Sequence, residues 1–233
     1  LLQEPLAEKY VRKVLGAREF LNGEQRWCLW FADESLETLE EMKNVKEILE
    51  KVKLFRLESI SQATKKIASE PHLFQQISQP KSDNYILVPS VSSERRKYVP
   101  IGFFSHNIIS TNLNHMIPNG TMFEFGILTS LAHNDWMRLV AGRLESRYRY
   151  SGTIVYNTFP FPTVTDEQKK HIEHLAEEIL LTREDFAGET LAKLYDPDTM
   201  PESLKIAHQN LDDAVDKLYN PKGFADTASR LAH

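Results

Sequence analysis

Hydrophobic residues recur near a helical period over residues 33–52. The repeat predicts an amphipathic helix that Asp33 caps, and helical character continues, after a break, to about Ala68. The Glu and Lys residues between the apolar positions would form its solvent-exposed face. The apolar positions that carry the prediction are Leu36, Leu39, Met42, Ile48, Leu49 and Val52.

The chain before this stretch has a mixed pattern. Pro5 and a four-residue apolar repeat predict a helix over residues 5–20. Asn22-Gly23 is a strong turn signal, after which the apolar run 26–31 predicts a buried strand. Within that run we interpret Cys28 as a buried small hydrophobic residue.

The pattern changes after Pro71 to short β-rich runs between polar turns. We expect strands over 84–89 and 97–104, joined by a basic polar turn, and further strands over 107–111, 121–125 and 147–156. A helix is predicted over 126–142, where apolar residues follow a helical period.

The C-terminal part predicts a helical hairpin. Two prolines in residues 157–162 permit neither a helix nor a central strand, so a boundary is expected there. Thr165, with Gln168 three residues later, predicts a capping box for a helix from residue 166 to about 183. A second helix over about 204–218 ends before Pro221. The predicted fold class is therefore α+β, with a mixed helix and sheet region followed by a helical hairpin.

Composition indicates an ordinary globular protein. The 233 residues are 41% hydrophobic and 26% charged, and no apolar run approaches the ~18 residues of a membrane helix. A single cysteine fits a reducing cytoplasm, where we expect the protein to act. Because the chain begins with Leu1, we expect it to be part of a larger protein.

Charge is distributed unevenly along the chain. The net charge of −5 combines −2 over residues 1–60, +4 over 61–162 and −7 over 163–233. A basic centre beside an acidic tail is compatible with nucleic-acid binding, because the local potential governs that contact.

Signatures of a self-contained enzyme are absent from the sequence. It has no P-loop, no glycine-rich dinucleotide loop, no cysteine-rich zinc spacing and no Ser-His-Asp arrangement. His171 and His174 lie one helical turn apart, but two surface histidines are a simpler interpretation than a metal site. His115 and His133 are interpreted as packing or polar contacts. We therefore expect no catalytic, cofactor-binding or metal-binding residue in this chain.

The stretch 142–151 holds the most informative chemistry. Arginine can bond guanine O6 and N7 with two parallel hydrogen bonds, and glutamate can accept from cytosine N4. Glu145 and Arg147 at strand spacing would point to the same side and could read the two halves of one G·C pair. A solvated strand with an internal ion pair is the alternative.

A second polar cluster lies in the predicted turn at residues 92–97. Two hydroxyls and three cations are typical phosphate-binding groups, although a soluble hairpin tip explains them equally well. The residues are Ser92, Ser93, Arg95, Arg96 and Lys97.

Six segments, taken in order and spacing, resemble the C-terminal part of Mme-type DNA methyltransferases, which are single-chain restriction–modification enzymes. The segments are 16–23, 89–103, 125–130, 142–151, 156–162 and 194–201. The resemblance implies a target recognition domain over residues 1–160 and a helical C-terminal domain over 161–233. It also implies that the nuclease, the S-adenosylmethionine site and the adenine-N6 methyltransferase motif lie upstream, since none occurs in this sequence.

The resemblance also implies roles for individual residues. Glu145 and Arg147 match positions that read one base pair, where relatives carry either Glu and Arg or Lys and Asp. Arg149, with Asn112 and Leu113, resembles positions that read a neighbouring pair. The cluster at 92–97 matches no base-reading position of the family, so its hydroxyls and cations, with Arg143, are expected to contact phosphate on their chemistry alone.

The sequence therefore predicts a module that reads double-stranded DNA in the major groove. The parent chain would supply the adjoining methyltransferase domain, bind S-adenosylmethionine, and flip and methylate the target adenine, with possible endonuclease activity. No membrane partner is expected. The alternative is a protein-interaction or scaffold domain without base readout.

Overall fold

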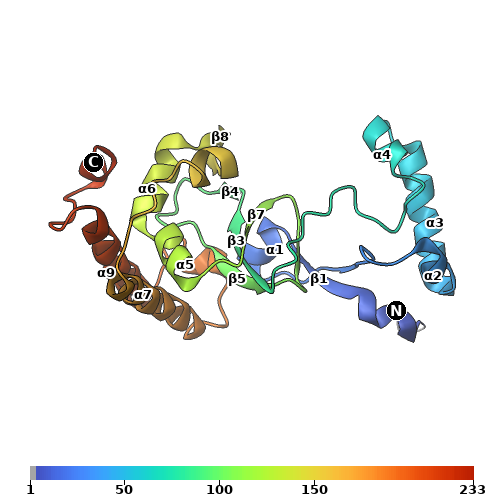
Figure 1. Ribbon diagram of the computed structural model, residues 1–233, viewed down its shortest axis with the longest axis horizontal. Coiled ribbons are helices and arrows are strands. Elements are labelled where there is room, and N and C mark those ends of the chain that lie inside the picture. The colour runs from blue at the N-terminus through green and yellow to red at the C-terminus, as the bar shows by residue number, and fades with distance from the viewer. Residues whose placement is uncertain (1–3) are drawn as a thin grey trace. The chain divides into compact units, whose positions relative to one another are not determined.

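The computed structural model describes residues 4–233 (Figure 1). The chain divides into two compact units. The first comprises Leu1–Val14, Gln25–Gln79 and Asn107–Ile109, and the second comprises Leu15–Glu24, Pro80–His106 and Ser110–His233. The described part of each unit is considered by itself below.

The first unit begins with a short 3₁₀ helix and a strand, so the single helix predicted over 5–20 is wrong in its middle, at residues 11–15, and only its two ends are helical. The turn η1 (Pro5–Tyr10) leads directly into β1 (Val11–Leu15), which pairs antiparallel with β2 (Trp27–Leu29). The pairing partner lies more than ten residues away, so local periodicity could not show it. The buried strand predicted over 26–31 is shorter and less buried than expected, since β2 covers only Trp27–Leu29 and Trp27 is exposed. Cys28 is half-buried, and desolvation raises the pKa of its thiol.

Three helices complete the first unit, and they confirm the predicted helical stretch with its break. They are α2 (Leu36–Glu40), α3 (Lys43–Glu58) and α4 (Gln62–Lys66). Ser35, and not Asp33, caps α2, because its hydroxyl accepts the Thr38 amide at 3.3 Å. The Glu4 carboxylate accepts the Asn44 amide at 2.8 Å and so caps the start of α3. A small core holds the unit together, formed by Ala7, Tyr10, Phe31, Leu39, Met42, Val45 and Leu49.

The second unit is built on a three-stranded antiparallel sheet. Its central strand β3 (Asn84–Pro89) matches the predicted bounds and lies between β5 (Gly102–Ser105) and β7 (Asn114–Pro118). Residues 85–89 are all buried, which explains their continuous apolar sequence. The predicted return strand is thus shorter than 97–104, β7 was not predicted, and the strand predicted over 107–111 is reduced to β6 (Ile109–Ser110).

Two helices follow the sheet where a strand and one helix were predicted. The helices are α5 (Met122–Thr129) and α6 (Leu131–Val140), separated at Ser130, whose backbone is extended. The strand over 121–125 is wrong, because Thr121 and Glu124 form a capping box: each side chain accepts the other residue's amide, at 3.3 and 2.7 Å. A short α1 (Ala17–Asn22), which ends at Gly23 with φ +69°, also belongs to this unit.

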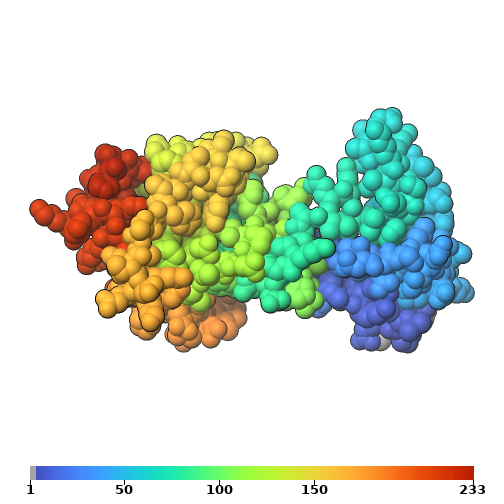
Figure 2. All heavy atoms as spheres, viewed as in Figure 1, coloured from blue at the N-terminus to red at the C-terminus, as the bar shows by residue number. Residues whose placement is uncertain are grey.

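The strand predicted over 147–156 ends at Arg149, as β9 (Arg147–Arg149). Residues Gly152–Tyr156 form a single π-helical turn, η2, that Ser151 caps, so the strand predicted to residue 156 is wrong beyond that point. The Trp136 indole donates to the Val155 carbonyl at 3.2 Å and holds this turn against α6. In Figure 2 the yellow-orange atoms of η2 lie beside the yellow-green atoms of α6.

The C-terminal helices confirm the predicted hairpin and, with the sheets, the α+β class. The elements are α7 (Asp166–Glu184), α8 (Leu191–Leu194), α9 (Glu202–Tyr219) and α10 (Thr227–Leu231). Thr165 and Gln168 form the predicted capping box, and α7 and α9 lie side by side (Figure 1). At Gly126 a Cβ atom would come within 2.8 Å of the Ile172 side chain, so glycine allows α5 to approach α7 closely.

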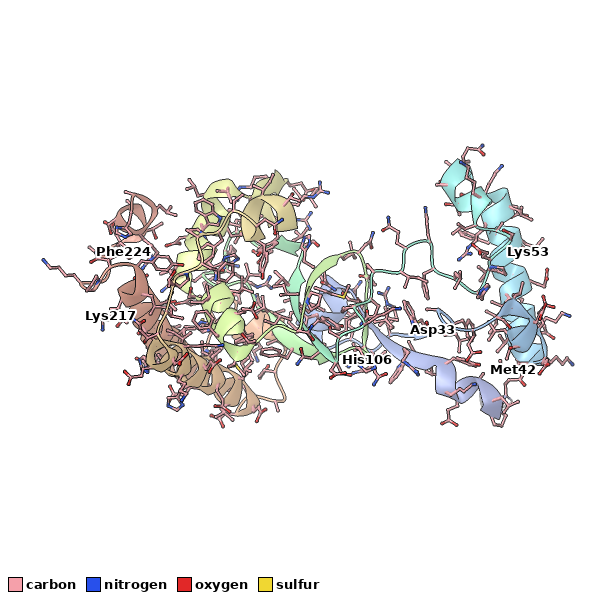
Figure 3. All side chains as sticks on the ribbon, viewed as in Figure 1. Asp33, Met42, Lys53, His106, Lys217 and Phe224 are labelled. Atoms are coloured by element: carbon pink, nitrogen blue, oxygen red, sulfur yellow. The ribbon has the colours of Figure 1, made fainter. Side chains whose placement is uncertain are left out.

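The second unit has two adjoining cores that connect these layers. One joins Ile127 of α5 to the inner faces of α7 and α9, and the other joins β3 to α5, α6 and Val155. The segment that carries Phe224 leads from α9 to α10 (Figure 3), where the Arg230 guanidinium lies 5.9 Å from the Phe224 ring centre. Among residues 4–233, no helix is both long and apolar enough to cross a membrane.

Candidate nucleic-acid interface

The basic stretch folds as a tight antiparallel hairpin, termed here the basic hairpin (residues 142–149). Strand β8 (Gly142–Leu144) pairs with β9 (Arg147–Arg149) so that Leu144 lies opposite Arg147. Glu145 and Ser146 form the two-residue turn between the strands. Glu145 is therefore not on a strand, as its spacing from Arg147 had indicated, but at the turn.

A third strand fixes the orientation of the hairpin. Strand β4 (Val91–Ser92) pairs with β9, with Ser92 opposite Tyr148 and Val91 opposite Arg149. Residues directly opposite each other point to the same face of a sheet. Ser92 is only 5% exposed and Tyr148 packs against the core of the unit, so theirs is the inner face. The outer face therefore carries Arg147 and Arg149, both exposed.

An ion pair joins the two candidate base-reading residues. The Arg147 Nη2 atom donates to Glu145 Oε2 at 2.7 Å, and both side chains are open to solvent, at 45% and 77% exposure. Glu145 has a φ of +57°, a region that residues with a Cβ atom enter at a cost of about 1–2 kcal/mol. Strained backbone of this kind clusters at functional sites.

A stacked arginine stiffens the other face of the hairpin. The Arg143 guanidinium lies 3.7 Å from the centre of the Tyr148 ring, and its Nη1 donates to the Ser146 carbonyl at 2.8 Å. Glu94 lies close to this turn. Its carboxylate accepts hydrogen bonds from the Glu94 backbone amide and from the Ser146 hydroxyl, which lower its pKa, and the charges of Arg143 and Arg147 lower it further. The turn is therefore held by contacts on both sides.

The second pair of candidate readers lies beside this sheet. Asn112 and Leu113 form an exposed turn before β7, and Leu113 is 55% exposed. Ser90 bridges this turn to the end of β9, because its amide donates to the Leu113 carbonyl at 3.0 Å and its carbonyl accepts the Tyr150 amide at 2.9 Å. The fold thus brings together two segments that lie 36 residues apart in sequence, counted from Leu113 to Arg149.

Two histidines hold the end of β9 in place, in agreement with their interpretation as polar contacts. The Nε2 atom of His133 lies 2.9 Å from the Tyr150 hydroxyl, and Nε2 of His115 lies 3.2 Å from the Tyr150 carbonyl. Burial lowers the pKa of His133 to about 3, so its ring is neutral near pH 7. Burial raises the pKa of the Tyr150 hydroxyl, which therefore stays protonated.

The basic loop (residues 92–97) presents fewer free groups than its sequence indicates. The Ser92 hydroxyl is buried, whereas Arg95 is exposed and forms ion pairs with Asp198 and, at 3.9 Å, with Asp196. Arg96 is half-buried, and desolvation lowers the pKa of its guanidinium. Lys97 is exposed, with its Nζ atom 5.2 Å from the centre of the neighbouring tyrosine ring.

An arginine that the sequence did not single out supports this loop from below. Arg138 Nη2 donates to the carbonyl oxygens of Lys97 and, at 2.9 Å, of Arg96, while Nη1 pairs with Asp135 at 3.0 Å. Asp135 is 4% exposed in its side chain. A charged residue in the buried part of α6 was the available sequence signal, since buried carboxylates are almost always paired.

Comparison with known proteins defines the class. The family model described as the MmeI target recognition domain matches residues 1–163, and the model described as the MmeI C-terminal domain matches residues 164–233. The chain therefore belongs to the MmeI family, as its motifs had indicated, and consists of a target recognition domain followed by a C-terminal domain.

Particular relatives are similar over nearly the whole chain. DNA methyltransferase A of Bacillus subtilis (strain 168) is 40% identical over 223 residues, which cover 95% of this chain and 25% of that protein. A solved structure of the Type IIL restriction-modification enzyme MmeI in complex with DNA is 46% identical, with a TM-score of 0.93, and the match covers 99% of this chain and 31% of that one. The chain thus spans about a quarter to a third of the length of these relatives.

Proposed function

We propose that this chain reads base pairs in the major groove of double-stranded DNA, as the recognition part of a DNA adenine-N6 methyltransferase or restriction–modification enzyme. The observation that carries the proposal is the outer face of the basic hairpin. It exposes Arg147 and Arg149 beside Glu145, while Tyr148 on the inner face is anchored in the core. A two-stranded ribbon of this kind fits the major groove.

The ion pair of the hairpin suits the reading of one C·G pair. In the free protein Glu145 and Arg147 satisfy each other at 2.7 Å. In the groove, Arg147 would turn to guanine O6 and N7, and Glu145 would accept the cytosine amino group. Because the two bases are joined by their own hydrogen bonds, a neighbouring cation and carboxylate match both halves at once. A good bidentate contact contributes about 1–3 kcal/mol of discrimination.

Other exposed groups would supply the second pair and the phosphate contacts. Arg149, with Asn112 and Leu113, is assigned to a neighbouring base pair, because Ser90 joins these segments at the same edge. The residues assigned to phosphate are Ser93, Arg95, Arg96, Lys97 and Arg143. Ser92 is left out of this set, because its hydroxyl is buried.

The parent chain would carry the chemistry. We assign S-adenosylmethionine binding, adenine flipping and methyl transfer to the part of the longer protein that precedes the target recognition domain, and we expect it to act in the cytoplasm. We place the domain boundary near residue 160, where the proline-containing segment precedes α7. Both cores of the second unit cross this boundary, since they include residues of α7, so the helical part would support the recognition part by packing.

The test exchanges the order of the two charges. In the longer methyltransferase that carries this chain, Glu145→Lys with Arg147→Asp should change the methylated sequence at one position from C·G to G·C, read by sequencing of methylated sites. The matched control exchanges the exposed pair on α9, Glu202→Lys with Lys205→Glu, and should leave the site unchanged. A methylated site that keeps every base in the hairpin variant contradicts the assignment.

A protein-interaction module is the competing function. Salt-dependent retention on duplex DNA separates the two, because neutralised phosphates release counterions and make binding fall steeply with salt. The double variant Arg95→Ala with Arg96→Ala should weaken binding to all sequences alike. A loss confined to one base would contradict the phosphate role of the basic loop.

A further inference from the structure

We infer that Leu144 contacts the methyl group of a thymine beside the base pair assigned to Glu145 and Arg147, and that Leu144 is therefore a specificity-determining residue. The inference rests on the proposed function, because it needs the basic hairpin to enter the major groove. Its first support is the position of Leu144, directly opposite Arg147 in the β8–β9 register. Opposite residues on one face have Cβ atoms about 4.5–5.5 Å apart.

The second support is that the other two residues of β8 place no side chain on the outer face. Of its three residues, Arg143 points to the inner face and stacks on Tyr148. Gly142, opposite Arg149, has no side chain. Leu144 therefore supplies the β8 side chain on the face that carries the two arginines, and whatever Arg147 touches in the groove lies within reach of Leu144.

The third support is the exposure of this side chain. Leu144 is 43% exposed and belongs to none of the hydrophobic cores formed by residues 4–233. Tyr148, one residue along the adjacent strand, does pack into a core. Much of the Leu144 side chain therefore remains open to a partner, and a partner that covered it would remove apolar surface from water.

The chemistry of the groove selects the partner. Major-groove edges present hydrogen-bond donors and acceptors, and the thymine C5-methyl group is the apolar group among them. A leucine opposite Arg147 cannot satisfy donors or acceptors, so a purine edge beside it would lose water without gaining a partner. Leu144 would therefore favour thymine and disfavour the other bases at one position.

The experiment uses the longer methyltransferase protein that carries this chain. A random duplex library is first selected for binding, and each thymine of the enriched sequence is then replaced singly by deoxyuridine, which removes only the methyl group. At one position this replacement should weaken DNA binding by the wild-type protein about fourfold, as expected for the loss of one buried methyl group. With Leu144→Ala, binding to the thymine duplex should fall by a similar factor, and deoxyuridine at that position should have no further effect.

Two controls keep the result interpretable. Leu181→Ala removes a leucine of similar exposure, 56%, from α7, and should retain the full response to deoxyuridine. Thermal unfolding of Leu144→Ala should match that of the wild type, since the side chain is outside the cores.

Failure of the inference and failure of the proposed function give different results. If no sequence is enriched, the proposed base readout itself is wrong. If a sequence is enriched but every deoxyuridine duplex binds like its thymine parent, or if Leu144→Ala responds as the wild type does, the contact is overturned while the base readout stands.

Discussion

Arg230 and Asp135 form a buried ion pair across 95 residues of sequence, with Arg230 Nη1 donating to Asp135 Oδ2 at 2.7 Å. The same guanidinium donates to both oxygens of Asp216 on α9, at 2.8 and 2.7 Å. The second oxygen of Asp135 pairs with Arg138, which holds the carbonyls of the basic loop. One continuous set of charged hydrogen bonds therefore runs from the C-terminal helix α10 to the loop assigned to phosphate.

Removing the centre of this network should be costly. Arg230 is 9% exposed in its side chain and is shared by two buried carboxylates, so Arg230→Met would remove the cation of Asp216 and one of the two cations beside Asp135. Breaking a buried pair from one side costs about 3–5 kcal/mol. We expect the free energy of unfolding from denaturant titration to fall by about 3 kcal/mol. The exposed Lys222→Met is the control and should change it by less than about 0.5 kcal/mol. Equal effects of the two substitutions would refute a structural role for the network.

A buried carboxyl near this network should make stability depend on pH. Asp212 accepts the Tyr98 hydroxyl at 2.6 Å and the Leu131 amide at 2.7 Å, and burial raises its pKa to about 6 despite these bonds. The folded state therefore holds a proton that the unfolded state releases near pH 4. Stability from this group is fully present below about pH 4 and is lost as pH rises through about 6.

The substitution Asp212→Asn tests this sign. The asparagine variant cannot acquire the charge, so its free energy of unfolding relative to the wild type should rise by roughly 2–3 kcal/mol between pH 4 and pH 7.5. Burial lowers the pKa of the His133 and His208 rings, which gives an opposite slope in both proteins. Subtracting the two curves removes that contribution. A difference that stays flat with pH would show that Asp212 keeps an ordinary pKa.

The strained turn of the basic hairpin should trade stability for recognition. Glu145 has a φ of +57°, which glycine adopts without a Cβ clash. We expect Glu145→Gly to raise the free energy of unfolding by about 0.5–1 kcal/mol while discrimination at the assigned base pair is lost. Ser146→Gly is the matched control at the neighbouring turn position. Ser146 does not have a positive φ, so glycine there should destabilise by about 0.5–1 kcal/mol. If both substitutions stabilise the protein, glycine is favourable at either turn position and the stabilisation does not report strain at Glu145.

The parts of the fold that the sequence predicted are those fixed by neighbours along the chain. Thr165 and Gln168 cap α7 within one turn, and the central strand β3 is a continuous apolar run, so both were predicted with their bounds. The strand β1 needs β2 as its partner and was mistaken for helix. The capping box at Thr121 and Glu124 was an available local signal, and the apolar residues around it led to a wrong strand.

The candidate site likewise has a part that the sequence could predict and a part that depends on residues distant in sequence. Residues that carry exposed chemistry, such as Glu145, Arg147 and Arg149, stand out by composition and family motif. Their supports do not, because Arg138 acts on the carbonyls of residues some forty positions earlier, and Asp135 meets Arg230 only after α10 has packed. Residue type alone also could not show that Ser92 faces inward or that Arg95 has carboxylate partners.

The carboxylates beside Arg95 should limit nonspecific DNA binding. Asp198 and Asp196 lie in the loop before α9, and both pair with Arg95, which must leave them to reach a phosphate. Asp198→Asn removes the nearer competitor. We expect affinity for duplex DNA of any sequence to rise roughly threefold at low salt, with the slope of log affinity against log salt steeper by up to about 0.9, the value for one further phosphate contact. The control Asp213→Asn makes the same change in net charge on the exposed side of α9. If that substitution raises affinity and slope equally, the effect belongs to net charge, and Arg95 is not held back by its ion pairs.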